Sequence, residues 1–256
     1  MPSSPLPSMR VGIAVRQTLK RSDAVVGAVH DVRRLVGAFV HNSTIGRDGR
    51  IIRDYLKSNE IRKLQIGAGP TALERWLSTD LNPRSDRAVY LDATRRFPFD
   101  DGTFDYAYSE HMIEHITWSQ GLFMLGECRR VLRPGGSIRV ATPDLRVLLD
   151  LYTRPEEPRA AAYIKWITDT FLEGVDVYKP AFVINNAFEN WGHQFLYDSE
   201  TMTMALRHAG FEDIRRCESE ESDDPHLRGI ESHGKNVGDK DMAAFETMVF
   251  EARRPQ

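Results

Sequence analysis

A short apolar strand that runs directly into two closely spaced glycines is the feature that most constrains the fold of this chain. It reads KLQIGAGP over residues 63–70, with Gly67 and Gly69 after the apolar residues. Glycine has no Cβ atom, so the backbone can take positive φ and a ligand can approach the peptide itself. We therefore predict a ligand-binding turn at the end of a buried strand.

Polar residues at the ends of later predicted strands support this interpretation. Asp80 and Asp92 end two of them, and the strand predicted over 103–109 runs into Glu110 and His111. Further strands are predicted over 89–91, 137–141, 214–217 and 247–252, and helices over 119–132 and 199–209. Strands that alternate with helices predict a parallel sheet with ligands at the carboxyl ends of its strands. Gly69 and Asp80 are eleven positions apart, so the first connecting helix should be short.

Three further motifs are more specific: FPFDDGTFD over 97–105, YAYSEH over 106–111 and VLRPGGS over 131–137. With the glycine turn, they resemble the class I (Rossmann-like) S-adenosylmethionine-dependent methyltransferases over roughly residues 62–152. The most similar subgroup comprises predicted small-molecule methyltransferases associated with glycan assembly. The resemblance implies an α/β fold: a doubly wound, mostly parallel seven-stranded sheet, with the last strand antiparallel and helices on both faces.

S-adenosylmethionine is the cofactor that this resemblance implies. Gly67 and Gly69 would admit its methionine part, Asp80 would accept from both ribose hydroxyls, and Asp92 would accept from the adenine amino group. An aspartate after a strand also forms turns and helix caps, which is the alternative for both acids. The implied cofactor contacts are Gln65, Gly67, Ala68, Gly69, Asp80, Leu81, Asp92, Ala93 and Ser109.

Two positions depart from the family pattern. The family usually has an acidic residue where Gln65 stands and often a third glycine where Thr71 stands. A glutamine can hydrogen-bond but carries no charge, so we expect it to hold the cofactor's ammonium group less strongly.

Methylation of an alcohol requires a base to take the hydroxyl proton, and histidine suits that task because its pKa lies near neutrality. The candidate catalytic residues are His111, after the fourth strand, His193, in a later loop, and Glu110, which would orient His111 or take the proton itself. His115 follows one helical turn after His111, where a structural role beside Glu114 is the simpler interpretation.

An insertion over about 153–198 is expected to form the acceptor pocket, because loops carry specificity on a fixed scaffold. It contains a predicted helix over 160–172 and an aromatic, amide-rich segment over 185–193. Amides beside aromatic rings suit a sugar, so we predict O-methylation of a saccharide hydroxyl in polysaccharide biosynthesis. The candidate substrate-binding residues are Asn190, Trp191, Gln194, Tyr197, His226 and Arg228.

Three alternatives stay open. The segment from His111 to His115 fits the HxxEH pattern of a zinc peptidase family, although no third ligand is evident and we expect no metal site. A nicotinamide-dependent oxidoreductase would need GxGxxG and an acidic residue about twenty positions further on. This chain has no third glycine, and Asp80 comes only eleven positions after Gly69. A methyltransferase-like binding protein without activity is the third, because of the glutamine at position 65.

Composition and charge set the remaining expectations. A net charge of −3 gives no general attraction to nucleic acid, and two cysteines outside any CxxC pair favour a reduced, cytoplasmic protein. We expect no membrane span. Residues 1–60 are interpreted as a tail and an amphipathic helix over 23–40 that caps the pocket or makes a homodimer contact, and residues 61–256 as the methyltransferase domain.

Overall fold

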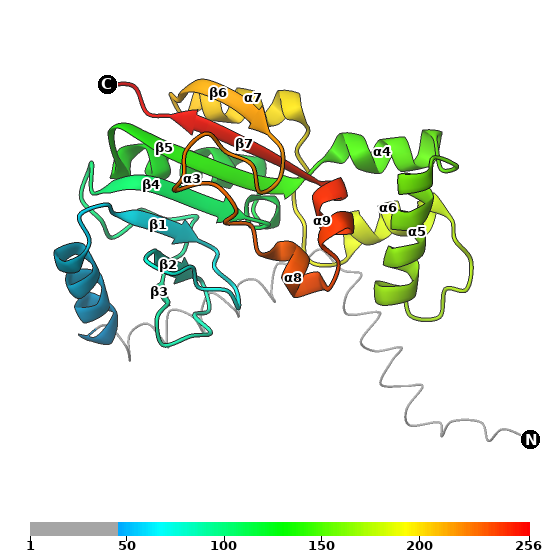
Figure 1. The fold of residues 1–256 in the computed structure, drawn as a ribbon, viewed down its shortest axis with the longest axis horizontal. Coiled ribbons are helices and arrows are strands. Elements are labelled where there is room, and N and C mark those ends of the chain that lie inside the picture. Colours follow the sequence, from blue (N-terminus) through cyan, green and yellow to red (C-terminus); the bar gives the residue numbers. More distant parts are fainter. Residues whose placement is uncertain (1–45) are drawn as a thin grey trace, which may run out of the picture. The chain divides into compact units, whose positions relative to one another are not determined.

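The protein is described by a computed structural model that covers residues 46–256, and the predicted helix over 23–40 lies outside this range. A seven-stranded sheet with the order β3-β2-β1-β4-β5-β7-β6 forms the centre of the fold (Figure 1). Its strands are β1 (Lys63–Ile66), β2 (Leu77–Asp80), β3 (Val89–Tyr90), β4 (Phe104–Glu110), β5 (Leu132–Pro143), β6 (Glu212–Cys217) and β7 (Thr247–Arg253). All neighbouring pairs are parallel except the two made by β7, which runs antiparallel between β5 and β6. The predicted sheet, with its antiparallel last strand, is confirmed.

The helices lie around this sheet. One helix covers residues 46–58, ahead of β1. The others are the short 3-10 helix η1 (Ile113–His115), α3 (Trp118–Val131), α4 (Leu145–Thr153), α5 (Pro158–Phe171), α6 (Pro180–Glu189), α7 (Ser199–His208), α8 (His233–Val237) and α9 (Lys240–Glu246). Thr117 and Asp198 are the N-cap residues of α3 and α7, and each makes a reciprocal capping box with the first turn of its helix. Figure 1 shows both helices behind the sheet and α4, α5 and α6 beyond the ends of the central strands.

The connection from β1 to β2 contains no helix, so the expectation of a short one is wrong. Instead, the buried amide of Gln65 holds this segment in a non-helical course. Its oxygen accepts hydrogen bonds from Leu73 N (3.0 Å) and Ser78 Oγ (2.7 Å), and its nitrogen donates to the carbonyl of Thr71 (2.9 Å). A crossover this short has room for these bonds but not for a packed helix.

A long loop between β6 and α8 covers the face of the sheet opposite α3 (Figure 1). Leu227 of this loop is buried against Trp76 and Tyr108. The guanidinium of Arg139, fully buried on β5, pairs with Glu231 of the loop (2.5 Å) and with Glu251 of β7 (2.6 Å). Ion pairs and a small apolar cluster therefore fix this loop where a helix would be usual in a doubly wound fold.

Two apolar cores divide the described chain. The larger one joins the sheet to α3 and α7 and includes Leu64, Leu125 and Val140. The smaller one lies among α4, α5, α6 and α9 and is centred on residues such as Ile167 and Val183. The predicted insertion over about 153–198 thus shares a second hydrophobic core with α4 and α9. None of the helices in residues 46–256 is both long and apolar enough to cross a bilayer.

Candidate active site

The glycine turn after β1 has the geometry that its sequence predicts. Gly67 and Gly69 take φ values of +70° and +54°. A Cβ atom on Gly67 would lie 2.4 Å from Met112 Cγ, so glycine there lets the segment after β4 approach the turn. A Cβ on Gly69 would meet no protein atom within 4 Å. Gly69 therefore faces open space, which leaves room for a ligand against its backbone.

Asp80 stands beside this turn at the end of β2. Its Oδ2 accepts a hydrogen bond from Gly69 N (2.9 Å), and its Oδ1 accepts one from Asn82 N (2.7 Å). The side chain is half-buried, and each carboxylate oxygen has a second lone pair. Asp80 therefore fits a ribose diol while it also connects two strand-end loops, and the site's residues fit a nucleoside cofactor.

Other predicted cofactor contacts have partners within the protein. Asp92 is buried and forms a turn, because its Oδ1 accepts from Thr94 N (3.0 Å) and Thr94 Oγ1 (2.6 Å), while its Oδ2 pairs with Arg95 (3.2 Å). The side-chain amide of Gln65 makes its hydrogen bonds to the β1–β2 connection, so it stabilises that segment. Ala68 and Ser109 are buried, and Leu81 and Ala93 are half-buried.

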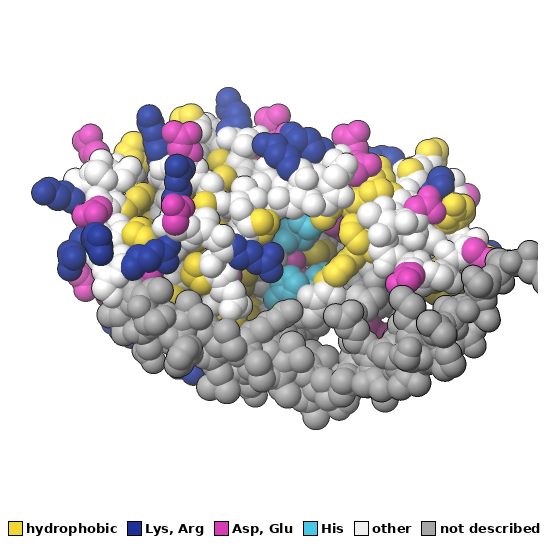
Figure 2. Space-filling view, turned by 90° about the horizontal axis from the view of Figure 1, so that it is seen from below, with side chains coloured by type: hydrophobic (Ala, Val, Ile, Leu, Met, Phe, Trp, Pro, Cys, Tyr) yellow, Lys and Arg dark blue, Asp and Glu magenta, His cyan; other side chains and the backbone are white. Residues whose placement is uncertain are grey.

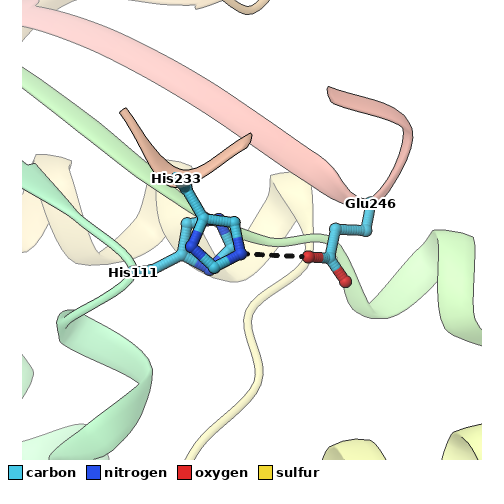
Figure 3. A group of neighbouring side chains, drawn as sticks. All are labelled: His111, His233 and Glu246. Atoms are coloured by element: carbon cyan, nitrogen blue, oxygen red, sulfur yellow. Dashed lines mark ion pairs between the residues drawn. The ribbon is translucent and has the colours of Figure 1, made fainter. Parts of the chain in front are cut away.

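His111 follows β4 directly and has an unusual backbone, with φ of +45°. Its Nδ1 lies 3.3 Å from Glu114 Oε1, and its Nε2 lies 2.9 Å from the hydroxyl of Thr247. The ring stacks on that of His233, with centroids 3.6 Å apart and planes at 14°. Figure 3 shows the two stacked rings with the carboxylate of Glu246 at their edge, 3.5 Å from His233 Nε2.

The charges around His111 determine its protonation. Burial opposes a charged imidazole, but the contact with the Glu114 carboxylate, together with the charges of Glu246 and Glu110, outweighs burial and raises the pKa of His111. Burial likewise opposes ionisation of Glu114, yet the His111 contact lowers the pKa of that carboxyl to about 2. The two residues thus form a buried, charge-assisted pair.

The sequence predicts that Glu110 orients His111 or takes the proton, but the hydrogen bonds of Glu110 go to a different segment. Its carboxylate accepts hydrogen bonds from Ser232 N (2.9 Å), Ser232 Oγ (2.8 Å) and His233 N (2.9 Å). It therefore anchors the start of α8 to the end of β4. His233 and Glu246 were missed as site residues, because nothing in the local sequence links either of them to His111 across more than a hundred positions.

The insertion delivers a second group of predicted residues to η1. Gln194 donates from its backbone to the carbonyl of Glu114 (2.7 Å) and from its side chain to that of His115 (2.8 Å). His193 therefore lies beside His115, with ring centroids 4.9 Å apart. Trp191, 44% exposed, packs edge-on against Phe171 and next to His193. In Figure 2, histidine side chains with acidic groups between them lie in a hollow of the molecular surface.

Three predicted substrate residues lie elsewhere. Tyr197 is fully buried against Trp118 and Phe195, so we reassign it from the acceptor pocket to the core. His226 packs at a tilt against Tyr106, and Arg228 donates to the carbonyl of Ser222; both residues lie in the loop that covers the sheet. Asn190 stays with the insertion group, and its amide donates to Asn186 Oδ1 (2.6 Å). The two histidines of the HxxEH segment face different neighbours, because His111 contacts His233 whereas His115 contacts His193.

Comparison with known proteins identifies the central part of the chain. Residues 62–140 match the family described as "Methyltransferase domain". A relative from Streptomyces fradiae, an uncharacterized 37.1 kDa protein in a transposon, is 33% identical over 84 residues, which cover 33% of this chain and 23% of the relative. The matched region therefore spans about a quarter of that relative's length.

Solved structures are matched at low identity and with TM-scores below 0.5. An S-adenosylmethionine-dependent methyltransferase from Archaeoglobus fulgidus is 17% identical, with coverage of 86% of this chain and 94% of that one and a TM-score of 0.43. A phosphoethanolamine N-methyltransferase from Haemonchus contortus is 16% identical, with coverages of 82% and 53% and a TM-score of 0.42. From the family match, residues 62–140 belong to a methyltransferase domain, and the cofactor of that domain is S-adenosylmethionine.

Proposed function

We propose that this protein transfers a methyl group from S-adenosylmethionine to a hydroxyl group of a small molecule, and that the acceptor is a saccharide. The observation that carries the proposal is the placement of His111, with its paired Glu114, directly after β4 and beside the glycine turn. A histidine in contact with a carboxylate at this position suits removal of a hydroxyl proton. His193, the other predicted base, belongs to the neighbouring group on the insertion.

When bound, the cofactor supplies an electrophilic methyl group on sulfur and leaves as a thioether. Gly67, Gly69 and Asp80 would hold it at the ends of β1 and β2. An acceptor hydroxyl would take the place of Thr247 Oγ1 at His111 Nε2 and pass its proton to that nitrogen as the oxygen–methyl bond forms. Glu114 would stabilise the resulting imidazolium, as it already stabilises the protonated form of His111.

The insertion supports a sugar as the acceptor. Trp191 exposes its ring beside His193, and Asn190 and Gln194 place amide groups on the same loop. An exposed aromatic ring can stack on the C–H face of a sugar, and amides can both donate to and accept from its hydroxyls. The glycan-linked subgroup that the sequence resembles fits the same acceptor class.

The test combines cofactor binding with acceptor screening. Calorimetry with S-adenosylhomocysteine should give saturable binding, and Asp80→Asn should weaken it about 10- to 100-fold, the effect of losing charge-assisted hydrogen bonds. Asp86→Asn, an exposed carboxyl near by, is the matched control and should bind as the parent does. Mass spectrometry should then detect addition of one methyl group to a saccharide in a mixed panel.

Each result bears on a separate part of the proposal. Normal affinity of Asp80→Asn would remove the cofactor assignment. Binding of a nicotinamide cofactor instead would favour the oxidoreductase alternative. Tight cofactor binding with methyl transfer to an amine or carbon acceptor, and none to hydroxyls, would keep a methyltransferase but reject O-methylation.

A further inference from the structure

Glu114 and His115 of η1 and His193 of the insertion form a compact group of side chains that the proposed methyl transfer does not require as a whole. One donor atom from each lies within 4.8 Å of the other two. A zinc ion with bonds of about 2.0–2.1 Å holds its ligand atoms roughly 3.4 Å apart. Small side-chain rotations would therefore close this group around an ion.

The centres of the two imidazole rings lie at the separation that a shared ion requires. Their centroids lie 4.9 Å apart and their planes meet at 69°. An ion bound to a ring nitrogen lies roughly 3.2 Å from that ring's centre, so two rings at a tetrahedral angle have centres about 5 Å apart. His115 and His193 match this separation.

A neighbouring group, His111, His233 and Glu246, also has three donor atoms within 4.8 Å of one another. Its rings, however, stack at 3.6 Å with planes at only 14°, so their nitrogen lone pairs lie in two nearly parallel planes and do not converge on one point (Figure 3). Binding an ion there would require the stacked rings to separate. Ring geometry therefore favours the group on η1 and the insertion.

Outer contacts prepare the ligand atoms of the favoured group. His193 Nδ1 lies 2.8 Å from the carbonyl oxygen of Ala187, which can only accept, so Nδ1 carries the proton and Nε2 keeps its lone pair. The bonds from Gln194 to the carbonyls of Glu114 and His115 fix the insertion against η1.

Glu114 supplies the carboxylate. It is completely buried, and its Oε2 accepts from the hydroxyl of Thr142 (3.0 Å). Its Oε1 receives no hydrogen bond of good geometry from the described residues, and the charged group beside it is His111 Nδ1 at 3.3 Å. A buried carboxylate oxygen is costly without a full set of partners, and a cation would supply one.

We propose that Glu114, His115 and His193 bind a divalent transition-metal ion of the zinc type through one carboxylate oxygen and two imidazole nitrogens. Two histidines and one glutamate are a ligand set that zinc accepts, and three protein ligands leave a fourth position for water or an acceptor oxygen. The site is distinct from the cofactor contacts at the glycine turn, so metal binding and cofactor binding can be measured separately.

Metal titration of the full-length protein tests the site. Metal is first removed from the protein with a chelator, and zinc is then titrated and followed by calorimetry; we expect one ion bound per chain. Titration with cobalt(II) should give visible d–d bands typical of low coordination number. His115→Ala and His193→Ala should each weaken binding by at least the ~10- to 100-fold that loss of an outer partner costs, and should abolish the cobalt bands. His193 is only half-buried, so its variant should fold, which circular dichroism would verify.

Two control variants make the result specific. His208→Ala removes an exposed histidine of α7 and should leave affinity and spectrum unchanged. His233→Ala removes a ligand of the neighbouring group and should also retain the bands. The proposal is overturned if neither metal binds, if His233→Ala abolishes binding while His115→Ala and His193→Ala do not, or if all variants bind alike. Binding of S-adenosylhomocysteine, measured on the same samples, reports separately on the methyltransferase proposal.

Discussion

At the scale of single residues, His111 combines a backbone of positive φ, a stacked imidazole and a buried carboxylate partner. A non-glycine residue with positive φ costs free energy and persists only where its surroundings enforce it. The sequence placed His111 at the end of β4 by the order of its motifs. It could not reveal His233 or Glu246, because their approach depends on how distant segments fold back over the strand end.

His111→Gln should therefore leave affinity for S-adenosylhomocysteine unchanged and lower methyl transfer about 10²- to 10⁴-fold, the usual contribution of a general base. The amide preserves the size and part of the hydrogen bonding of the imidazole but cannot take a proton at neutral pH. Single-turnover transfer to the identified acceptor measures the effect, with His208→Gln as the exposed control. Parent-like transfer by His111→Gln would place the base elsewhere.

At the scale of elements, strand order and strand ends were predictable because buried parallel strands are short apolar runs that end in glycine or polar residues. The connection from β1 to β2 was not, because the hydrogen bonds of Gln65 replace the helix that alternation predicts. The loop between β6 and α8 was equally hidden. Its position depends on Arg139, whose partners Glu231 and Glu251 lie about a hundred residues further along the chain.

Arg139→Met should destabilise the protein by about 3–5 kcal/mol, because it leaves two buried carboxylates without their cation. Arg133→Met, on the same strand, removes an exposed guanidinium from the buried carboxylate of Asp105, which keeps its hydrogen bond from Arg62 N (2.7 Å), so the loss should be only about 1 kcal/mol. Urea unfolding of the two variants gives the comparison. Equal losses would mean that the ion pairs of Arg139 do not hold the loop.

At the scale of the whole described chain, the larger core serves the sheet and its cofactor contacts, whereas the smaller one supports the insertion that carries Trp191 and His193. The sequence predicts an insertion over about 153–198, because aromatic and amide residues interrupt the strand–helix alternation there. It did not predict that α9, far along the chain, completes the insertion's core through Phe245. The assignment of Tyr197 to the acceptor pocket was wrong because its burial also depends on distant packing. The sequence of a polar loop does not show whether an aromatic side chain in it faces solvent or the core.

Ile167→Ala, in the smaller core, should lower the free energy of unfolding by about 2–5 kcal/mol and raise the KM for the acceptor, while the Kd for S-adenosylhomocysteine stays the same. Leu149→Ala, half-exposed on α4, is the control and should stay within about 0.5 kcal/mol of the parent. Urea unfolding and calorimetry measure the two effects. A matching loss of cofactor affinity would show that the two cores do not act separately.

The amide of Gln65 affects how the structure of the β1–β2 connection responds to pH. An amide neither gains nor loses a proton across the range in which enzymes work, so the bonds that shape the bend behind β1 keep the same donors and acceptors from mildly acidic to mildly alkaline solution. A carboxylate at this position would exchange its acceptor for a donor on acidification. The bend behind β1 should therefore keep its form in mildly acidic solution, whatever happens to the histidines near it.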